Sequence, residues 1–402
     1  MISALITLLT LTVSVTNPDG VAREAEPITV SIPHPSSVQA RSASIRGAGD
    51  TPWQLDDLDF DGYADELVLL TDLRPRETKR FTVELSKSPA KAEFTPGTSA
   101  YIKLHDKNQK HPRIQAITYP GNADNRQMYN SIYGHGAVLE GPYSAIRVYM
   151  DNRQSVDLYA KHKPGLELET TGFYTTKEQM EQGYGRDILW AGTSVALGSF
   201  RGWDGSQPLT IDSVRTRGQK VVASGPVRSI IEVEDLGWVP RPGARPVDMR
   251  QRYTVYAGHR DYDVEITLKG APAGETYCTG IQKIMEDNRG FIDPDGLAGS
   301  WGNNIPDKKM GTSDTLGLGI FVPAPYLSGT AEDDVNYLTL LRPDSHGQIR
   351  YSFTSAALRD VTSPRTSDEW FETLKKWRET KRRPVEVKVI SPTSNPRTSR
   401  RR

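Results

Sequence analysis

A histidine between two glycines opens the stretch of the chain with the most reactive side chains. His135 lies in Tyr133-Gly134-His135-Gly136, where the small neighbours leave the imidazole sterically open. An open imidazole acts as a general base or acid near neutral pH. Glu140 and Tyr143 follow directly, so a carboxylate and a phenol lie close in sequence to this base.

The next segment supplies cations and a second phenol. Residues 144–150 alternate as a strand, which puts Arg147 and Tyr149 on one face of a sheet. Arg147 and Arg153 suit bidentate binding of a carboxylate, and Tyr143 or Tyr149 suits protonation of a leaving oxygen or stacking on a sugar ring. The alternative is an exposed sheet face that carries ordinary cross-strand ion pairs.

Further polar and aromatic residues extend this cluster. Lys161 and His162 follow the strand predicted at 155–160, and loops at strand ends often hold site residues. Glycine-aromatic segments occur at 184–190, which ends in Trp190, and at 198–204, which contains Arg201, and His259 comes later beside an Arg-Asp pair. Such segments suit sugars, although a basic turn and packing of Trp190 in the core are equally ordinary interpretations. The predicted catalytic residues are His135, Tyr143, Arg147, Tyr149 and His162, and the predicted substrate-binding residues are Trp53, Gln54, Glu140, Asp151, Asn152, Arg153, Lys161, Arg201 and His259.

A separate acidic segment resembles a calcium loop. Asp57, Asp59, Asp61 and Asp65 surround Gly62, and alternate oxygen ligands with a glycine at the turn suit a hard cation. An EF-hand would need glutamate at the twelfth position, which is Val68, so the match is partial. A structural calcium ion is therefore one expectation, and an acidic turn whose side chains bind local amides is the other.

Strands must position nearly all of these residues. Apolar and β-branched residues alternate or run together between clusters of Gly, Pro, Asn or Asp. The strands predicted in this way are 27–32, 79–85, 144–150, 155–160, 166–175, 221–235, 249–258, 262–268, 315–322 and 336–341.

Helices are few in this pattern. A short helix is predicted at 175–182. Near the end, Thr366 and Glu369 form a capping box, and an apolar stripe containing Trp370 and Leu374 follows. We expect a mainly β protein: a large antiparallel β-sandwich with few short helices and a C-terminal helix.

The predicted domains are unequal. Residues 1–16 are uncharged and resemble a signal peptide that overlaps a first strand. Residues 17–97 are expected to form an N-terminal β module with the acidic loop, and residues 98–402 the large sandwich. Export to the periplasm or the outside of the cell is the corresponding expectation, and the apolar segment is too short to span a membrane.

Charge and motifs exclude several functions. The 50 basic and 50 acidic side chains cancel, whereas a nucleic-acid-binding protein normally has a basic face. The single Cys278 excludes internal disulfides and cysteine-based zinc sites. No nucleophile elbow, zinc-protease motif or nucleotide loop occurs in a fitting context, so no cofactor is expected for the chemistry. The oligomeric state is left open.

Four segments resemble a known family, the domain-of-unknown-function family 4861. They are WQLDDLDFDGYADELVLL at 53–70, YGHGAVLEGPYSAIRVYMDNRQSVDLYAKH at 133–162, LELETTGFYT at 166–175 and GYGRDILWAGTSVALGSFRG at 183–202. The resemblance implies an exported bacterial protein from gene clusters for polysaccharide breakdown. It also implies a β-sandwich similar to galactose-mutarotase-like carbohydrate enzymes, acting on uronate-rich glycans. The family offers no agreed catalytic motif to carry over.

For a uronate ligand, the residues above suit β-elimination by a lyase or dehydratase. An arginine would neutralise the C6 carboxylate, His135 or a tyrosine would remove the C5 proton, and a second tyrosine or His162 would protonate the departing C4 oxygen. One alternative is a glycoside hydrolase with paired carboxylates from Glu140, Asp151 and Asp157. The other is a glycan-binding module without catalysis.

Overall fold

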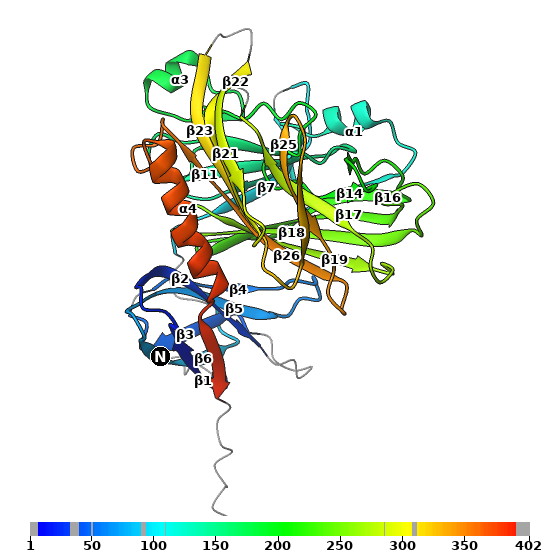
Figure 1. Ribbon diagram of the computed structural model, residues 1–402. Helices are drawn as coiled ribbons and strands as arrows, with labels where there is room; N and C mark the ends of the chain where they lie inside the picture. Colours follow the sequence, from blue (N-terminus) through cyan, green and yellow to red (C-terminus); the bar gives the residue numbers. More distant parts are fainter. Residues whose placement is uncertain are drawn as a thin grey trace, which may run out of the picture. The chain divides into compact units, whose positions relative to one another are not determined.

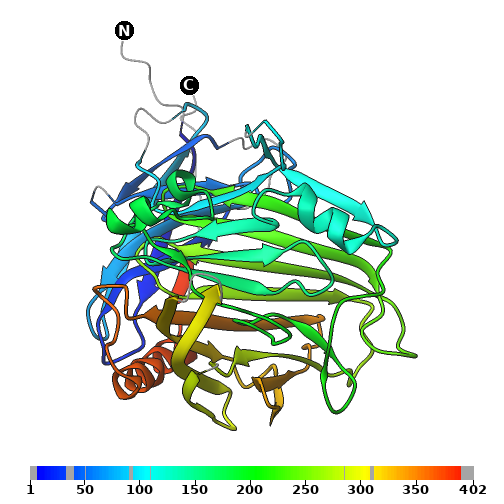
Figure 2. The ribbon, with the colours of Figure 1, turned by 90° about the horizontal axis from the view of Figure 1, so that it is seen from above.

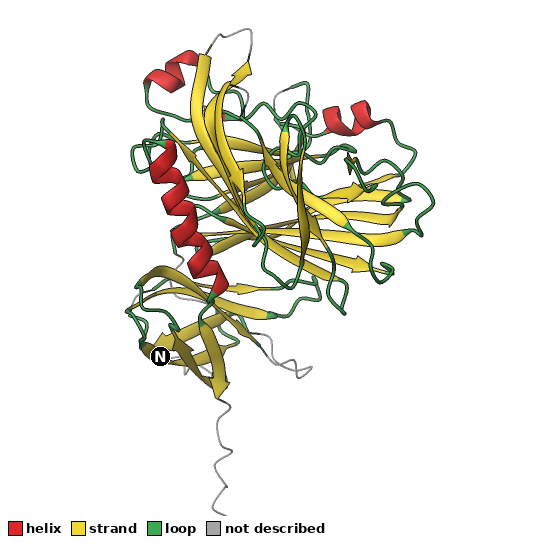
Figure 3. Cartoon of the chain, viewed as in Figure 1, coloured by secondary structure: helices red, strands yellow, loops and turns green. Residues whose placement is uncertain are grey.

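The computed structural model describes residues 7–390, apart from 33–39, 50, 90–93, 109, 285 and 308–311. The chain divides into two compact units, one of residues up to Pro96 with the segment from Arg383 onward, and one of Gly97–Arg382. Antiparallel strands dominate both units (Figures 1 and 3). The mainly β, antiparallel class predicted from the sequence is confirmed.

The smaller unit contains a four-stranded sheet in the order β27-β1-β6-β3 and a three-stranded sheet in the order β2-β5-β4. In β1, Leu11, Val13 and Val15 alternate with hydroxyl residues and enter the apolar core of this unit, as the period of two requires. The strands are β1 (Thr7–Thr16), β2 (Arg23–Ser31), β3 (Ser42–Arg46), β4 (Trp53–Asp56), β5 (Glu66–Leu73), β6 (Thr78–Ser86) and β27 (Glu386–Ile390).

Two features of the smaller unit bear on the predicted domains. Of the segment compared with a signal peptide, Thr7–Thr16 forms β1, and residues 1–6 lie outside the described residues. Export stays a prediction. Residues 383–390, predicted as part of the large sandwich, belong to the smaller unit, because β27 pairs with β1 there.

The larger unit contains three sheets. Their orders are β13-β12-β11-β10-β7-β8, β21-β22-β23-β26-β19-β18-β17-β16-β9 and β15-β14-β20-β25-β24. The first contains β7 (Ser99–Lys103), β8 (Arg113–Ile114), β10 (Gly136–Glu140), β11 (Ser144–Tyr149), β12 (Val156–Ala160) and β13 (Arg186–Asp187). The second contains β9 (Ala116–Pro120), β16 (Thr216–Ser224), β17 (Arg228–Trp238), β18 (Val247–Tyr256), β19 (Tyr262–Lys269), β21 (Glu286–Ile292), β22 (Leu297–Asp307), β23 (Thr312–Phe321) and β26 (Gln348–Ala357). The third contains β14 (Arg201–Trp203), β15 (Pro208–Leu209), β20 (Tyr277–Gln282), β24 (Leu327–Glu332) and β25 (Asn336–Leu341).

The six-stranded sheet packs one face on the nine-stranded sheet, and Figure 2 shows the two layers from above. Ile146, Val148 and Leu158 lie in this interior with Ile231 and Val233 of the opposite sheet. Because side chains alternate along a strand, the polar residues between them must lie on the other face. That outward face carries the candidate site.

Three short helices connect strands of the larger unit. In the chain, α1 (Asn125–Ser131) lies between β9 and β10, and α2 (Leu168–Thr171) and α3 (Lys177–Glu181) lie between β12 and β13. The helix predicted at 175–182 is confirmed as α3, which has a capping box at Thr176. The strand predicted at 166–175 is wrong, because α2 forms there instead. The amides of Glu167 and Leu168 donate to the buried carboxylate of Glu140, and Gly172 ends the helix in the left-handed region.

The C-terminal helix α4 (Ser367–Arg382) is confirmed, and Thr366 Oγ1 accepts the amide of Glu369 as the capping box predicts. Trp370 and Leu374 pack against β22 and β23 in one apolar cluster. Gly317 and Gly319 make this contact close, since a Cβ at either position would collide with one of those side chains. Among the described residues, no helix is long and apolar enough to cross a membrane.

Candidate functional site

The backbone turns sharply at His135, just before β10. Gly134 and His135 have φ values of 76° and 71°, and a Cβ at Gly136 would collide with the carbonyl of Val148. A non-glycine residue with positive φ is uncommon and often marks a functional turn. The predicted glycine-histidine-glycine motif is therefore a conformational requirement that sets the direction of the imidazole.

Two hydrogen bonds define the protonation of this imidazole. Nδ1 lies 3.0 Å from the carbonyl oxygen of Tyr129, and Nε2 lies 3.1 Å from the hydroxyl of Tyr174. Because a carbonyl only accepts, Nδ1 carries the proton, and Nε2 is left to accept from the tyrosine. His135 is thus held with its basic nitrogen toward a phenol.

Burial keeps this base neutral. Burial lowers the pKa of His135 below 6.5, and the hydrogen bond to the carbonyl of Tyr129 opposes the shift only in part. The ring also stacks on that of Tyr129 at a centroid distance of 3.9 Å. At neutral pH the imidazole is therefore unprotonated and available as a base.

Tyr174 was not among the predicted site residues. It follows α2, where Gly172 and Phe173 have φ values of 63° and 70°. Phe173 is buried in the aromatic cluster on the sheet face, whereas the Tyr174 side chain is 58% exposed. The left-handed turn thus gives the two neighbours different environments. Phe173 anchors the segment to the sheet, and Tyr174 presents an accessible phenol.

Arg147 and Tyr149 of β11 lie together, as the alternation predicted. Arg147 forms a buried ion pair with Asp157 on the neighbouring strand, and its Nη2 also donates to the Tyr149 hydroxyl at 2.9 Å. Tyr149 in turn donates to Asp157 at 2.9 Å. Burial and then the charge of Asp157 raise the pKa of Tyr149, so it stays a neutral phenol.

Aromatic rings surround the Arg147 guanidinium. The ring centroids of Tyr149, Tyr159 and Phe173 lie 4.8, 5.4 and 5.6 Å from its central carbon. Nε and Nη1 of Arg147 are buried without a hydrogen-bond partner in the described part of the chain. Arg147 is therefore a positioning cation beneath the site and does not itself face solvent.

Arg153 is the accessible cation. Its guanidinium lies 5.8 and 5.5 Å from the ring centroids of Tyr129 and Tyr149, and its side chain is 43% exposed. Asp151 accepts from Nε and Nη2 at 2.9 and 2.6 Å, which holds the planar group in place. An exposed, oriented guanidinium is suited to a ligand carboxylate.

Asp187 in β13 completes the cluster and was also outside the predicted set. One of its oxygens lies 3.5 Å from Arg147 Nη2, and the other accepts from the amide of Leu189. Burial and the neighbouring Asp157 raise the pKa of Asp187, although a third of the side chain is exposed. Asp187 is therefore the carboxyl group of this cluster best suited to donate a proton.

Tyr143 and His162 contact residues outside this cluster. Tyr143 stacks against Arg260 at 4.4 Å and lines a shallow pocket with Ser144 and Asp360. His162 Nδ1 lies 2.9 Å from the carbonyl oxygen of Arg359. Both residues lie beyond strand ends, where the alternation that orients Arg147 and Tyr149 no longer applies.

Glu140 and Lys161 form a buried ion pair at 2.6 Å. Glu140 Oε1 also accepts the amides that begin α2, and Lys161 donates to the carbonyl of Gly141 at 2.8 Å. Glu140 Oε2 is buried without a hydrogen-bond partner in the described part of the chain, and the contacts of Oε1 and of Lys161 anchor the segment that carries Tyr174.

The side chains of three other predicted substrate-binding residues contact groups outside this cluster. Arg201 is buried in the sandwich and donates to the carbonyl of Phe200. His259 lies 3.4 Å from Asp261, and Asn152 donates to Asp212. These contacts do not join them to His135.

Trp53 and Gln54 belong to β4 of the smaller unit. Trp53 makes an edge contact with Phe94, and Gln54 donates to Asp56 at 2.7 Å. Nothing in these contacts indicates a sugar site.

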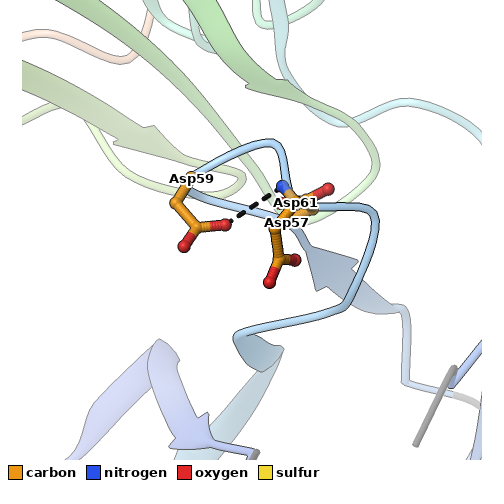
Figure 4. Close-up of side chains that lie close together, drawn as sticks. All are labelled: Asp57, Asp59 and Asp61. Carbon is orange, nitrogen blue, oxygen red and sulfur yellow. Dashed lines mark hydrogen bonds between the residues drawn. The ribbon is translucent and has the colours of Figure 1, made fainter. Parts of the chain in front are cut away.

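The acidic loop brings Asp57, Asp59 and Asp61 together, with one oxygen of each within 4.8 Å of the others (Figure 4). Asp57 accepts the amides of Phe60 and Gly62, and Asp65 accepts the amide of Leu58. These bonds form an acidic turn and leave further lone pairs on the carboxylates. Calcium binding remains a prediction.

If the loop binds calcium, adding the ion should raise the thermal unfolding midpoint of the wild-type chain, since a ligand of the folded state stabilises it. Calcium at about 100 times its dissociation constant would contribute about 2.7 kcal/mol. The measurement is a melting curve with calcium and with chelator. Asp59→Asn should remove the difference, whereas Asp333→Asn, in another acidic turn, should retain it. Equal midpoints with and without calcium for the wild-type chain would rule the ion out.

Sequence comparison decides the family. A model described as "Domain of unknown function (DUF4861)" matches residues 15–387. The chain belongs to the DUF4861 family. This membership confirms the resemblance of the four segments and carries no activity with it. No curated protein matches the sequence.

Solved structures with a similar fold include two proteins from Enterococcus faecalis. One is an alpha-mannosidase of strain V583, with 11% identity and a TM-score of 0.48 over 95% of this chain and 46% of that one. The other is a protein in the glycosyl hydrolase family 38, with 10% identity and a TM-score of 0.44 over 95% and 47%. The DUF4861 chain thus spans less than half the length of either.

Proposed function

We propose that this DUF4861 protein is an exported carbohydrate-active enzyme that acts on uronic-acid residues of oligosaccharides or polysaccharides. The reaction is β-elimination, in which the enzyme removes a proton from the sugar. The observation that carries the proposal is the hydrogen bond of 3.1 Å between the exposed Tyr174 hydroxyl and His135 Nε2. The direction toward sugars comes from the polysaccharide context that the family resemblance implies.

Proton removal is assigned to the pair of Tyr174 and His135. As the Tyr174 oxygen takes the C5 proton of the sugar, His135 Nε2 accepts the phenolic proton, so no free phenolate has to form. The C4–O bond then breaks, the electron pair of the C5–H bond forms the C4=C5 double bond, and the departing oxygen takes a proton. Asp187, with its raised pKa, is the assigned donor of that proton.

Arg153 is assigned to the sugar carboxylate. Negative charge develops on the carboxylate when the C5 proton leaves, and a fixed guanidinium stabilises that charge. Arg147 supports this arrangement from below, since it holds Tyr149 and Asp157 in place.

Contacts of the three predicted hydrolase carboxylates favour elimination over hydrolysis. Glu140 is engaged by Lys161, Asp151 by Arg153, and Asp157 by Arg147, and all three are buried. A hydrolase needs two carboxyl groups that both reach the glycosidic bond. A binding module without catalysis would not require the His135–Tyr174 contact.

The test of the proposal is the ultraviolet absorbance of the 4,5-unsaturated product when the wild-type chain is incubated with fragments of pectin, ulvan and alginate. We expect absorbance to rise for at least one of them. The absence of a rise and of new reducing ends across these uronates would reject the proposal.

Replacing the accessible cation should mainly weaken substrate binding. Arg153→Ala should raise KM about tenfold to a hundredfold, because a charge-assisted contact to the carboxylate is lost. The control is Arg241→Ala, since Arg241 is also 43% exposed and paired to a carboxylate, that of Glu275. Steady-state kinetics would count against the assignment if both variants behaved alike.

A further inference from the structure

Trp190 is exposed to an extent unusual for its type. All seven tryptophans lie in the described part of the chain, and the other six are buried or half-buried. The Trp190 side chain is 46% exposed. A large aromatic surface left in water is a feature of binding sites, because burying it against a ligand is favourable.

The position of Trp190 relates it to the proposed reaction centre. It follows β13, in which Asp187 contacts Arg147. Three residues of extended chain span at most about 10 Å, so Trp190 lies within about two sugar units of Asp187. Asp187 is the group assigned to the leaving oxygen, and a sugar attached through that oxygen would extend in this region.

A buried polar group beside Trp190 provides a second, independent observation. The amide of Trp190 donates to Asn304 Oδ1 at 3.1 Å. Asn304, on β22, is fully buried, and its Nδ2 has no hydrogen-bond partner in the described part of the chain. A buried donor without an acceptor is costly, so an acceptor from a ligand or water is expected at this position.

Two arginines share one carboxylate next to Asn304. Strands β22 and β23 lie side by side (Figure 1). Asn304 lies opposite Asp314 on β23, and this one carboxylate binds two arginines, Arg186 and Arg359. The three groups therefore sum to one positive charge. Arg359 is 22% exposed and 2.9 Å from Asp314, so its guanidinium is the part of this group within reach of a ligand.

We propose that Trp190, Asn304 and Arg359 form a second sugar subsite for an acidic residue joined to the one that reacts. The indole stacks on the sugar ring, the buried Asn304 amide donates to a water that bridges to a ring substituent, and Arg359 attracts the carboxylate. The ligand class rests on the proposed function, and the consequence is that the substrate is an oligosaccharide and not a single uronate.

Binding measured by calorimetry tests the subsite without depending on turnover. The probes are tetrameric fragments of pectin and alginate and the corresponding monosaccharides. Trp190→Ala should weaken tetramer binding about tenfold and leave monosaccharide binding unchanged, while Trp190→Phe should retain part of the affinity. The control is Phe60→Ala, because Phe60 is also 46% exposed but belongs to the acidic loop.

The outcomes separate this inference from the proposed function. Equal tetramer affinity for the wild-type chain and Trp190→Ala, or no tetramer binding by the wild-type chain, would overturn the subsite. Weaker tetramer binding by Trp190→Ala supports it even if no unsaturated product forms, in which case the β-elimination alone is rejected.

Discussion

His135→Gln and Tyr174→Phe should each lower kcat/KM for a uronate oligosaccharide about 10²–10⁴-fold, the range for loss of a positioned general base. Each variant removes one partner of the 3.1 Å contact. Tyr174→Phe keeps the exposed ring, whereas His135→Gln also removes the stacking on Tyr129. The double variant should lose little more than either single variant, because the two residues act as one unit. The measurement is initial rate by ultraviolet absorbance.

The controls for these variants are a remote histidine and a remote phenol. His346→Gln and Tyr326→Phe lie outside the cluster and should keep wild-type rates. A Tyr174→Phe variant with full activity would remove the phenol from the mechanism, and additive losses in the double variant would show that the two residues act separately.

The pH profile provides a second readout of the same pair. Burial lowers the pKa of His135, so the neutral, basic imidazole persists as pH falls through 6.5 and is lost only at lower pH. The acidic limb of kcat/KM should therefore have its midpoint below 6.5. A midpoint above 6.5 would mean that another group is titrating.

Arg147→Met should destabilise the larger unit by about 3–5 kcal/mol, because it leaves the buried carboxylate of Asp157 without its counter-ion. The free energy of unfolding from denaturant titration measures this loss. The double variant Arg147→Met with Asp157→Leu should recover much of it, since neither buried charge then remains.

The matched control is an exposed cross-strand pair. Arg350→Ala breaks the Arg350–Glu265 contact on neighbouring strands, and it should cost under about 1 kcal/mol. If Arg147→Met lowered the free energy of unfolding as little as this control, the Arg147 guanidinium would not be needed to stabilise the site.

Alternation within strands was sufficient to predict part of the site. Arg147 and Tyr149 lie on one face of β11 because a strand has a period of two, and this result needs no tertiary information. The glycines around His135 predicted an open imidazole, whereas the ring is half-buried and stacks on Tyr129. The same reasoning does not extend past a strand end, which is why Tyr143 and His162 have different neighbours.

Tyr174 and Asp187 could not be found from local pattern. Residues 166–175 have a strand-like composition, but the buried Glu140 carboxylate accepts the amides of Glu167 and Leu168 and favours a helical turn. Asp187 lies in a strand of two residues, too short for periodicity to indicate a face. Both positions depend on contacts between segments distant in sequence.

The masses of the products from the wild-type chain and a uronate oligosaccharide test the central claim most directly. Elimination breaks the C4–O bond without adding water, so the product carrying the new double bond must be one water lighter than its hydrolytic counterpart. We predict such unsaturated products, together with their ultraviolet absorbance and their loss in Tyr174→Phe. Saturated products that have gained one water would contradict β-elimination and make the protein a hydrolase.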